Sequence, residues 1–418
     1  MSNNTRFDLS DRLIHFFRDV DPASGNSPQM PENFAFNNFV QGPVYPALFL
    51  LRSALRMHRL WATWSVRGGA RTIYGPRPAV CFSEMPLSAF LESSAARSKR
   101  GEAMTSYALT FSKTALYGRG ANPVIYGLSN RGASPPPGKG GGPRIFPANV
   151  LPLDEQYRYV TYAPTSARRI DWTHEREWRL PFSGDLTAYE KELVEFGHIS
   201  EAELVPHVRL DVGPLQGIGV IVKSTSEVEC VKADILSLID RGVVANGHFD
   251  HILDISRLPP PQDLYDPAAV EKAIGNAAIT FDGYFNLPEA EVTAAVDQFR
   301  AWVQAVERAS GQPEAGDSGA CWLWLLDSTH PFVRALVQAG RVIVNKEGRY
   351  LACLTEFDGV RSVEQREQMT LELAKLVDAE HDIDCTYFSV HGGQGEDDVP
   401  YYVDESFLDN RLFYNIDF

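Results

Sequence analysis

A proline-rich segment in the second half of the chain, LPPPQDLYDP at residues 258–267, most constrains what this sequence can fold into. Four of its ten residues are proline. Proline lacks a backbone N–H and restricts the residue before it, so neither a long helix nor a central strand can run through the segment. The total length of 418 residues predicts two or three domains. We therefore expect a domain boundary here, with one domain over residues 1–260 and a second, smaller one over residues 261–418.

The net charge is distributed unevenly along the chain. The whole sequence carries −15, which by itself argues against a nucleic-acid partner. Residues 1–150 carry +9, residues 151–260 carry −7 and residues 261–418 carry −17. The basic part contains one arginine-rich stretch: Arg52, Arg56, Arg59, Arg67, Arg71 and Arg77. It predicts either a surface for a polyanion such as DNA or RNA, or a solvated helix face together with residues that bind a nucleotide pyrophosphate.

The composition is that of an ordinary globular chain. Hydrophobic residues make up 44% and charged residues 22% of the sequence, which excludes a largely disordered or fibrous protein. The five cysteines are scattered, odd in number and without a C-x-x-C pair, so we expect neither a disulfide framework nor a cysteine-rich zinc site. Residues 1–17 lack a signal-peptide pattern, and the apolar run at residues 44–51 is far shorter than the roughly 20 residues of a membrane helix. These features predict a cytoplasmic protein that does not enter a membrane.

Hydrophobic periodicity predicts a mixture of helices and strands, so the expected fold class is α+β. Helices are expected at residues 45–59, 86–98, 226–240, 289–310 and 362–380. Strands are expected at residues 79–83, 107–111, 123–126, 177–181, 218–223, 321–326 and 341–345.

A basic insertion of glycine and proline, RGASPPPGKGGGPR at residues 131–144, interrupts this pattern. Such a segment cannot pack a core. Its GKGGGP run follows prolines rather than a strand, so it does not fit a dinucleotide-binding fingerprint. We expect a mobile loop, which is either a solvated connector or an arm that contacts phosphates through Arg131, Lys139 and Arg144.

The common catalytic and metal-binding signatures are missing from the sequence. It contains no GxxxxGK[ST], HExxH or GxSxG pattern. His248 and His251, near Asp250 and Asp254, come closest to a metal-binding cluster, and we predict no metal there. His391 in YFSVHGGQG is followed by two glycines, which a turn after a strand explains.

The segment HEREWRL, residues 174–180, is the strongest candidate for a catalytic site in the sequence. On an extended strand, Glu175, Glu177 and Arg179 would share one face. One interpretation is an edge strand with paired surface charges, which contribute little to stability. The other is that Glu177, next to Trp178, is a catalytic carboxylate that stabilises a cationic sugar transition state or holds a ribose hydroxyl.

A second polar residue, His15, interrupts the apolar run LIHFF. One interpretation is a core or interface histidine whose hydrogen bonds are satisfied. The alternative is that His15 presents its imidazole to a ligand while Phe16 and Phe17 pack or stack.

Several motifs, taken in order, resemble the AbiGi-type proteins of bacterial abortive infection, which look like distant relatives of the DarT-type ADP-ribosyltransferase toxins. The resemblance spans about residues 10–260. It rests on LIHFFR (13–18), AVCFSEMPLSAF (79–90), YALTFSK (107–113), NPVIYGLS (122–129), HEREWRL (174–180), IGVIVKS (218–224) and HILDISRLP (251–259). The fold it implies is a small mixed α/β domain that clamps NAD between two central sheets, followed here by an acidic α+β domain.

The resemblance implies a split NAD site built from three strands. His15 corresponds to the first-strand residue that holds the nicotinamide ribose or amide. Ser83 corresponds to the second-strand position that supports the site. Glu177 corresponds to the catalytic glutamate of the last motif, and Glu175 to a residue that orients the acceptor.

The resemblance also implies aromatic and basic residues around NAD. Phe16 is expected beside the cofactor, and either Tyr107 or Tyr126 stacks on nicotinamide. Three arginines compete for the role of the NAD-contacting arginine: Arg18, Arg67 and Arg71. Arg71, in the basic run RGGAR, is preferred.

The function implied is that of an anti-phage toxin, an NAD-dependent mono-ADP-ribosyltransferase that uses NAD as a substrate and modifies DNA, RNA or protein. The acidic residues 261–418 are expected either to regulate it, as an internal inhibitor displaced by a phage or nucleic-acid trigger, or to act as a solubilising domain. The competing hypothesis is a binding protein without catalysis, a degenerate transferase fold that senses a nucleotide or serves as an antitoxin to a toxin partner.

Overall fold

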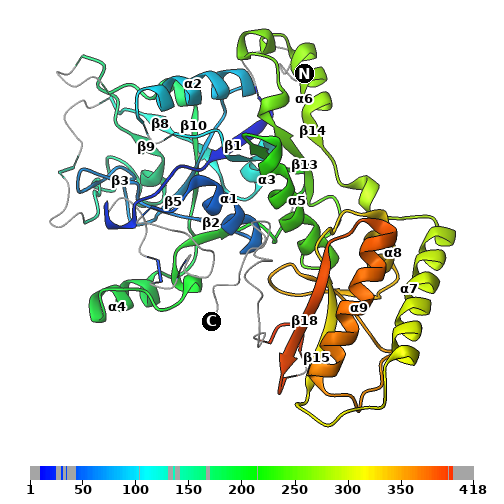
Figure 1. Ribbon diagram of the computed structural model, residues 1–418. Helices are drawn as coiled ribbons and strands as arrows, with labels where there is room; N and C mark the ends of the chain where they lie inside the picture. Colours follow the sequence, from blue (N-terminus) through cyan, green and yellow to red (C-terminus); the bar gives the residue numbers. More distant parts are fainter. Residues whose placement is uncertain are drawn as a thin grey trace. The chain divides into compact units, whose positions relative to one another are not determined.

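The computed structural model describes residues 10–24, 30–31, 34, 44–102, 104–129, 135–136, 142–165, 170–213, 215–393 and 395–398 (Figure 1). These residues form two compact units. The described part of the first unit lies within Met1–Val228 and Asn246–Ile279, and that of the second within Glu229–Ala245 and Thr280–Asn415. The α+β class expected from the sequence is confirmed. In the part of the chain that the structure describes, no helix is both long enough and apolar enough to cross a lipid bilayer.

The division between the units falls after Ile279 rather than after Pro260. Helix α6 (Pro267–Ala277) begins with proline in its first turn, where a missing N–H costs nothing, and Asp266 caps it by accepting a hydrogen bond of 3.0 Å from the Ala269 N–H. Leu264 and one face of α6 then pack into the core of the first unit. The prolines therefore break the secondary structure without ending the domain.

An eight-stranded sheet forms the centre of the first unit, in the order β14-β13-β12-β6-β1-β5-β10-β7. Its strands are β1 (Arg12–Phe16), β5 (Ala79–Ser83), β6 (Ala108–Ser112), β7 (Asn122–Pro123), β10 (Glu177–Pro181), β12 (Ile218–Val222), β13 (Phe249–Asp254) and β14 (Ala278–Ile279). All neighbours are antiparallel except β12 and β13. These two are joined through helix α5, which is the connection that a parallel pair requires.

The helices and small sheets of the first unit surround this sheet (Figure 1). The helices are α1 (Ala47–Arg56), α2 (Leu87–Lys99), α3 (Lys113–Gly118), α4 (Thr187–Glu195), the start of α5 (Thr225–Asp240) and α6. Three further strand pairs are β2 (Arg59–Trp61) with β11 (His207–Arg209), β3 (Val66–Arg67) with β4 (Ala70–Arg71), and β8 (Ile125–Tyr126) with β9 (Tyr159–Val160). One buried core unites α2 and α6 with the strands through Ile14, Phe90, Leu91, Ile221 and Leu253.

Strand β1 is paired unequally on its two sides. It pairs with β6 at every position from Arg12 to Phe16, but with β5 only where Ile14 lies opposite Ser83. The backbone ladder between β1 and β5 therefore ends after Ile14. The sheet opens between these two central strands.

The described residues of the second unit form a four-stranded antiparallel sheet in the order β16-β17-β15-β18, which helices accompany (Figure 1). The strands are β15 (Gly319–Leu325), β16 (Val342–Val344), β17 (Tyr350–Ala352) and β18 (Cys385–His391), and the helices are α7 (Glu289–Ala309), α8 (Pro331–Gln338) and α9 (Val363–His381). A core that includes Phe299, Leu323, Leu336 and Leu373 joins the helices to the sheet. The carboxyl-terminal part of α5 also belongs to this unit.

Most of the glycine- and proline-rich segment 131–144 lies outside the described residues, including Arg131 and Lys139. Arg144 is described, and its guanidinium lies 4.4 Å from the centre of the Tyr74 ring. Arg144 also donates hydrogen bonds of 3.3 Å to the carbonyl oxygens of Pro135 and Arg71, so its contacts lie within the same unit.

Candidate functional site

Strands β1, β5 and β10 lie side by side and bring three of the sequence-predicted residues into one region. Ser83, at the end of β5, lies opposite Ile14 of β1 on one side and opposite Glu177 of β10 on the other. His15 follows Ile14, at the point where β1 and β5 separate. The three strands expected to carry the site are therefore neighbours in the sheet.

Glu177 is held by Arg179, two residues further along β10 and on the same face. Arg179 donates hydrogen bonds of 2.8 and 3.2 Å from Nε and Nη2 to the two carboxylate oxygens. Arg179 is buried, and its Nη1 donates to the carbonyl oxygens of Tyr157 and Tyr159 at 2.6 and 3.2 Å. Burial alone would lower the pKa of Arg179, but the Glu177 carboxylate and Cys81 together outweigh that effect and the pKa is raised. The pair thus presents a fixed carboxylate at the start of β10.

Glu175 does not lie on the strand, contrary to the prediction that it shares a face with Glu177 and Arg179. It ends a short 3-10 helix, η5 (Thr173–Glu175), and Arg176 has a left-handed backbone with φ of 45°. This turn reorients the chain just before β10. The Glu175 carboxylate accepts a hydrogen bond of 2.8 Å from Arg97 Nη1 on α2, and its pKa is raised by burial and by the nearby Glu177 charge.

Ser83 supports the turn between the two glutamates. Its hydroxyl donates a hydrogen bond of 2.7 Å to the carbonyl oxygen of Glu175 and accepts one of 3.1 Å from the Met85 N–H. The backbone N–H of Glu177 donates to the hydroxyl of Tyr126 at 3.0 Å. Ser83 and Tyr126 thereby fix the backbone on both sides of Arg176.

His15 fills the opening between β1 and β5. Its Nδ1 lies 2.9 Å from the carbonyl oxygen of Cys81, and because a carbonyl only accepts, Nδ1 carries the proton. The ring meets Phe17 and Phe82 edge-on, with centroids 5.0 and 5.8 Å away. Burial lowers the pKa of His15 to about 4, so the imidazole is neutral at neutral pH.

The burial of His15 predicts an acid-sensitive contribution to stability. Its pKa falls from 6.5 to about 4 on folding, so below pH 6.5 the unfolded chain binds the proton first. The stabilisation is complete above pH 6.5 and decreases as the pH falls towards 4, by up to about 3 kcal/mol. In denaturant titrations, we expect the unfolding free energy of wild type to fall by about 3 kcal/mol more than that of His15→Gln when the pH is lowered from 7 to 4.5. His198→Gln, at an exposed position, is the control, and an equal pH effect in both variants would contradict the assignment.

Two of the other predicted residues, Phe16 and Tyr107, contact side chains outside the region of Glu177. Phe16 packs against Phe90 of α2, with ring centroids 6.3 Å apart. Tyr107 donates a hydrogen bond of 2.5 Å to Glu227 at the start of α5, and Lys223 Nζ lies 4.4 Å from the centre of its ring. Tyr107 thus lies at the β6 and β12 side of the sheet. Of the predicted aromatic residues, Tyr126 is the one with a hydrogen bond to Glu177.

Three arginines act on one another electrostatically, and one of them, Arg97, is bound to Glu175. The pKa of Arg18 is lowered by burial and by repulsion from Arg67 and Arg97. Arg97 pairs with Glu175 and with Glu102, at 2.8 and 2.7 Å. Among the residues that the structure describes, no carboxylate forms an ion pair with Arg18. A half-buried cation beside two like charges, with no counter-ion in the part of the chain that the structure describes, suits an anionic ligand.

Arg71, the arginine preferred from the sequence, lies in a different environment. Its guanidinium lies 4.0 Å from the centre of the Trp64 ring, and the charge of Glu190 on α4 acts on it. Arg18 interacts electrostatically with Arg97, the partner of Glu175, so we prefer Arg18 to Arg71 for contact with a ligand at the two glutamates. Sequence reasoning missed Arg97, because nothing in the local pattern of α2 distinguishes it from the neighbouring surface residues.

The arginine-rich stretch is not one exposed basic face. Arg59 pairs with Glu203 at 2.9 Å, Arg77 pairs with Asp154 at 3.0 Å, and Arg52 is buried. Arg67 is exposed. Much of the positive charge counted along the sequence is thus neutralised within the unit.

Comparison with known proteins gives one match. A family model described as a protein of unknown function (DUF4427) matches residues 287–416. No curated protein and no solved structure matches the chain. The matched segment corresponds to the second unit from helix α7 onward. It includes none of the residues of the first unit that are described above.

Proposed function

We propose that the first unit binds NAD and transfers its ADP-ribosyl group to a nucleophile, which makes the protein an NAD-dependent mono-ADP-ribosyltransferase. The observation that carries this proposal is the Glu177 carboxylate, held beside the opening between β1 and β5. The motif order LIHFFR, CFSEMPLS and E-x-E-W-R supports it. The resemblance implies a split transferase sheet for this function, and we assign that role to the eight-stranded sheet at the limited pairing of β1 with β5.

In the proposed reaction, Glu177 accepts a hydrogen bond from a hydroxyl of the nicotinamide ribose. The bond between the anomeric carbon and the nicotinamide nitrogen breaks, and its electron pair leaves with neutral nicotinamide. Glu177 stabilises the positive charge that develops on the sugar, an effect on the order of 3 kcal/mol for one well-placed group. The acceptor nucleophile then bonds to the anomeric carbon and loses its proton. Neutral His15 is assigned to the nicotinamide ribose or amide.

The arginine group suits the diphosphate of NAD. Guanidinium groups form charge-assisted hydrogen bonds with phosphate oxygens. Arg18 has no carboxylate partner among the described residues and is the first candidate, with Arg67 beside it. Arg97 instead fixes Glu175, which is assigned to the acceptor.

Substitution of Arg18 should weaken NAD binding. We expect Arg18→Gln to raise the dissociation constant of NAD about 10- to 100-fold, since a hydrogen bond to a charged group contributes roughly 1.5–3 kcal/mol. Arg71→Gln makes the same change in the same unit and should leave the affinity near that of wild type. Calorimetric titration of the three purified proteins with NAD measures both effects. A loss of affinity in Arg71→Gln but not in Arg18→Gln would reverse the assignment.

The wider role that we propose is that of a toxin in bacterial phage defence, with DNA, RNA or protein as the acceptor. The proposal extends to regulation by the carboxyl-terminal region, whose net charge of −17 over residues 261–418 complements a basic partner. A phage-derived trigger or an antitoxin is then the expected regulatory partner. Labelled NAD added to the purified protein with DNA, RNA and lysate proteins identifies the acceptor as the fraction that takes up the label.

A second candidate function is a nucleotide-binding or antitoxin protein without catalysis. It is favoured by one specific observation, that both Glu177 oxygens already accept hydrogen bonds from Arg179. Expression in cells separates the two proposals. Growth arrest that depends on Glu177 supports the transferase, whereas protection against a neighbouring toxin supports the antitoxin.

A further inference from the structure

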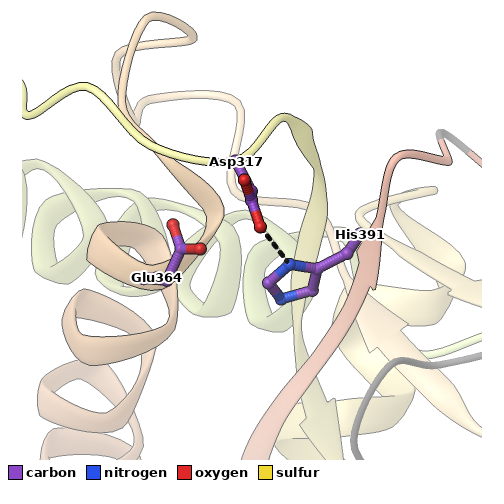
Figure 2. Close-up of side chains that lie close together, drawn as sticks. All are labelled: Asp317, Glu364 and His391. Atoms are coloured by element: carbon purple, nitrogen blue, oxygen red, sulfur yellow. Dashed lines mark ion pairs between the residues drawn. The ribbon is translucent and has the colours of Figure 1, made fainter.

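Three side chains of the kinds that bind metal ions converge in the second unit, and none of them is among the residues assigned above to NAD (Figure 2). Asp317 precedes β15, Glu364 lies in the first turn of α9, and His391 ends β18. Their nearest ligand atoms all lie within 4.8 Å of one another. Asp317 Oδ2 lies 3.7 Å from Nδ1 of His391. From the sequence, the two glycines after His391 were explained by a turn after a strand, and no metal site was predicted.

The three segments that carry these side chains are joined directly through their backbones. The Val363 N–H, next to Glu364, donates a hydrogen bond of 3.0 Å to the carbonyl oxygen of Asp317. The Gly392 N–H, next to His391, donates one of 2.7 Å to the carbonyl oxygen of Ser318. At Gly319 a Cβ atom would lie 2.0 Å from the Val390 carbonyl oxygen, so only glycine permits this close approach. The backbone segments that carry the three ligands are therefore held together before any ion binds, while the side chains of Asp317 and Glu364 are exposed.

A fourth side chain orients the imidazole. Oε1 of Glu367, one turn after Glu364 on α9, lies 3.3 Å from Nε2 of His391, and the Ser389 hydroxyl donates a hydrogen bond to the same carboxylate. An ionised carboxylate only accepts, so in the neutral form of the imidazole that binds a metal, Nε2 carries the proton. Nδ1 then carries the lone pair on the side of Asp317. A carboxylate on the far nitrogen is the usual partner of a metal-bound histidine, because it fixes the tautomer and the ring orientation.

We propose that Asp317, Glu364 and His391 bind one divalent transition-metal ion through two carboxylate oxygens and one imidazole nitrogen. Imidazole favours Zn²⁺ and its neighbours over Mg²⁺ or Ca²⁺, which prefer oxygen ligands alone. Three protein ligands leave a coordination position for water or another ligand. The site is independent of NAD chemistry.

Zn²⁺ alone is the probe for this site. The full chain, freed of metal with a chelator, should bind one equivalent of Zn²⁺ in calorimetric titration, and Co²⁺ should give d–d absorption bands typical of a mixed nitrogen and oxygen site. Glu367→Gln should weaken Zn²⁺ binding by about 10-fold, the usual cost of losing the outer partner of a ligating histidine. His391→Ala and Glu364→Gln remove a ligand and should weaken it by more than about 100-fold.

The matched control is Glu372→Gln, which makes the same change at an exposed position of α9 and should bind Zn²⁺ like wild type. Circular dichroism of each variant confirms that α9 and the sheet remain folded. Two outcomes would overturn the proposal. One is the absence of saturable Zn²⁺ and Co²⁺ binding in the folded wild type. The other is wild-type affinity in folded His391→Ala, which would mean an adventitious ion only. Neither readout requires NAD turnover, so failure here is distinct from failure of the transferase proposal.

Discussion

Replacement of Glu177 by glutamine is expected to abolish NAD turnover while NAD binding persists. Glutamine keeps the shape of the side chain and one oxygen that can accept from Arg179, but it removes the charge that stabilises the developing sugar cation. The loss of one such electrostatic group lowers the rate about 100- to 1000-fold. Release of nicotinamide from labelled NAD measures the rate, and calorimetry measures binding. Wild-type nicotinamide release by folded Glu177→Gln would sink the assignment of Glu177.

The same substitution affects stability, and this effect has to be separated from catalysis. Arg179 is buried and would lose its carboxylate partner, although it keeps the carbonyl oxygens of Tyr157 and Tyr159. We expect a loss of about 1–3 kcal/mol in unfolding free energy. Glu190→Gln, at an exposed position of α4, is the control and should change neither stability nor turnover. Assays at a temperature where all variants are folded then isolate the chemical effect.

Local patterns predicted the elements of the site better than their arrangement. The strands at residues 79–83 and 177–181 were predicted with the bounds that the structure has, because apolar residues bounded by turn signals are a short-range property. The turn at Arg176 was missed, since a left-handed arginine is rare and the sequence EREWR reads as a continuous strand. Glu175 was therefore placed on the wrong element.

Contacts between residues far apart in the sequence could not be predicted from local patterns, because the fold decides which residues meet. Arg18 and Arg71 are equivalent as arginines, and only the fold sets one beside Arg97 and the other on Trp64. The domain boundary was also misplaced. A proline-rich segment indicates where regular secondary structure stops, but it does not indicate whether the next helix, α6, packs into the preceding core, as it does here. Asp317, Glu364 and His391 come from three distant segments. Their convergence depends on strand register and on the packing of α9.

Breaking the buried ion pair of the second unit is expected to give the largest loss of stability. The guanidinium of Arg334 on α8 donates hydrogen bonds of 2.6 and 2.9 Å to the two oxygens of Asp240 on α5. The side chains are only 3% and 4% exposed. The Tyr350 hydroxyl donates to the same carboxylate at 2.7 Å, and Arg334 Nε donates to the carbonyl oxygen of Tyr284 at 2.9 Å. Removal of one partner therefore leaves an uncompensated charge in the interior.

Arg334→Met should lower the unfolding free energy of the second unit by about 3–5 kcal/mol. Lys375→Met breaks the exposed pair with Glu372 and should cost less than about 1 kcal/mol. Hydrogen exchange of the α8 and β17 amides in denaturant reports on this unit specifically. The double variant Arg334→Met, Asp240→Leu should recover part of the loss, because neither charge is then left buried alone. If Arg334→Met were no more destabilising than Lys375→Met, the Arg334–Asp240 ion pair would not be the contact that holds the end of α5 in this unit. The assignment of residues 229–245 to the second unit would then have to rest on apolar packing alone.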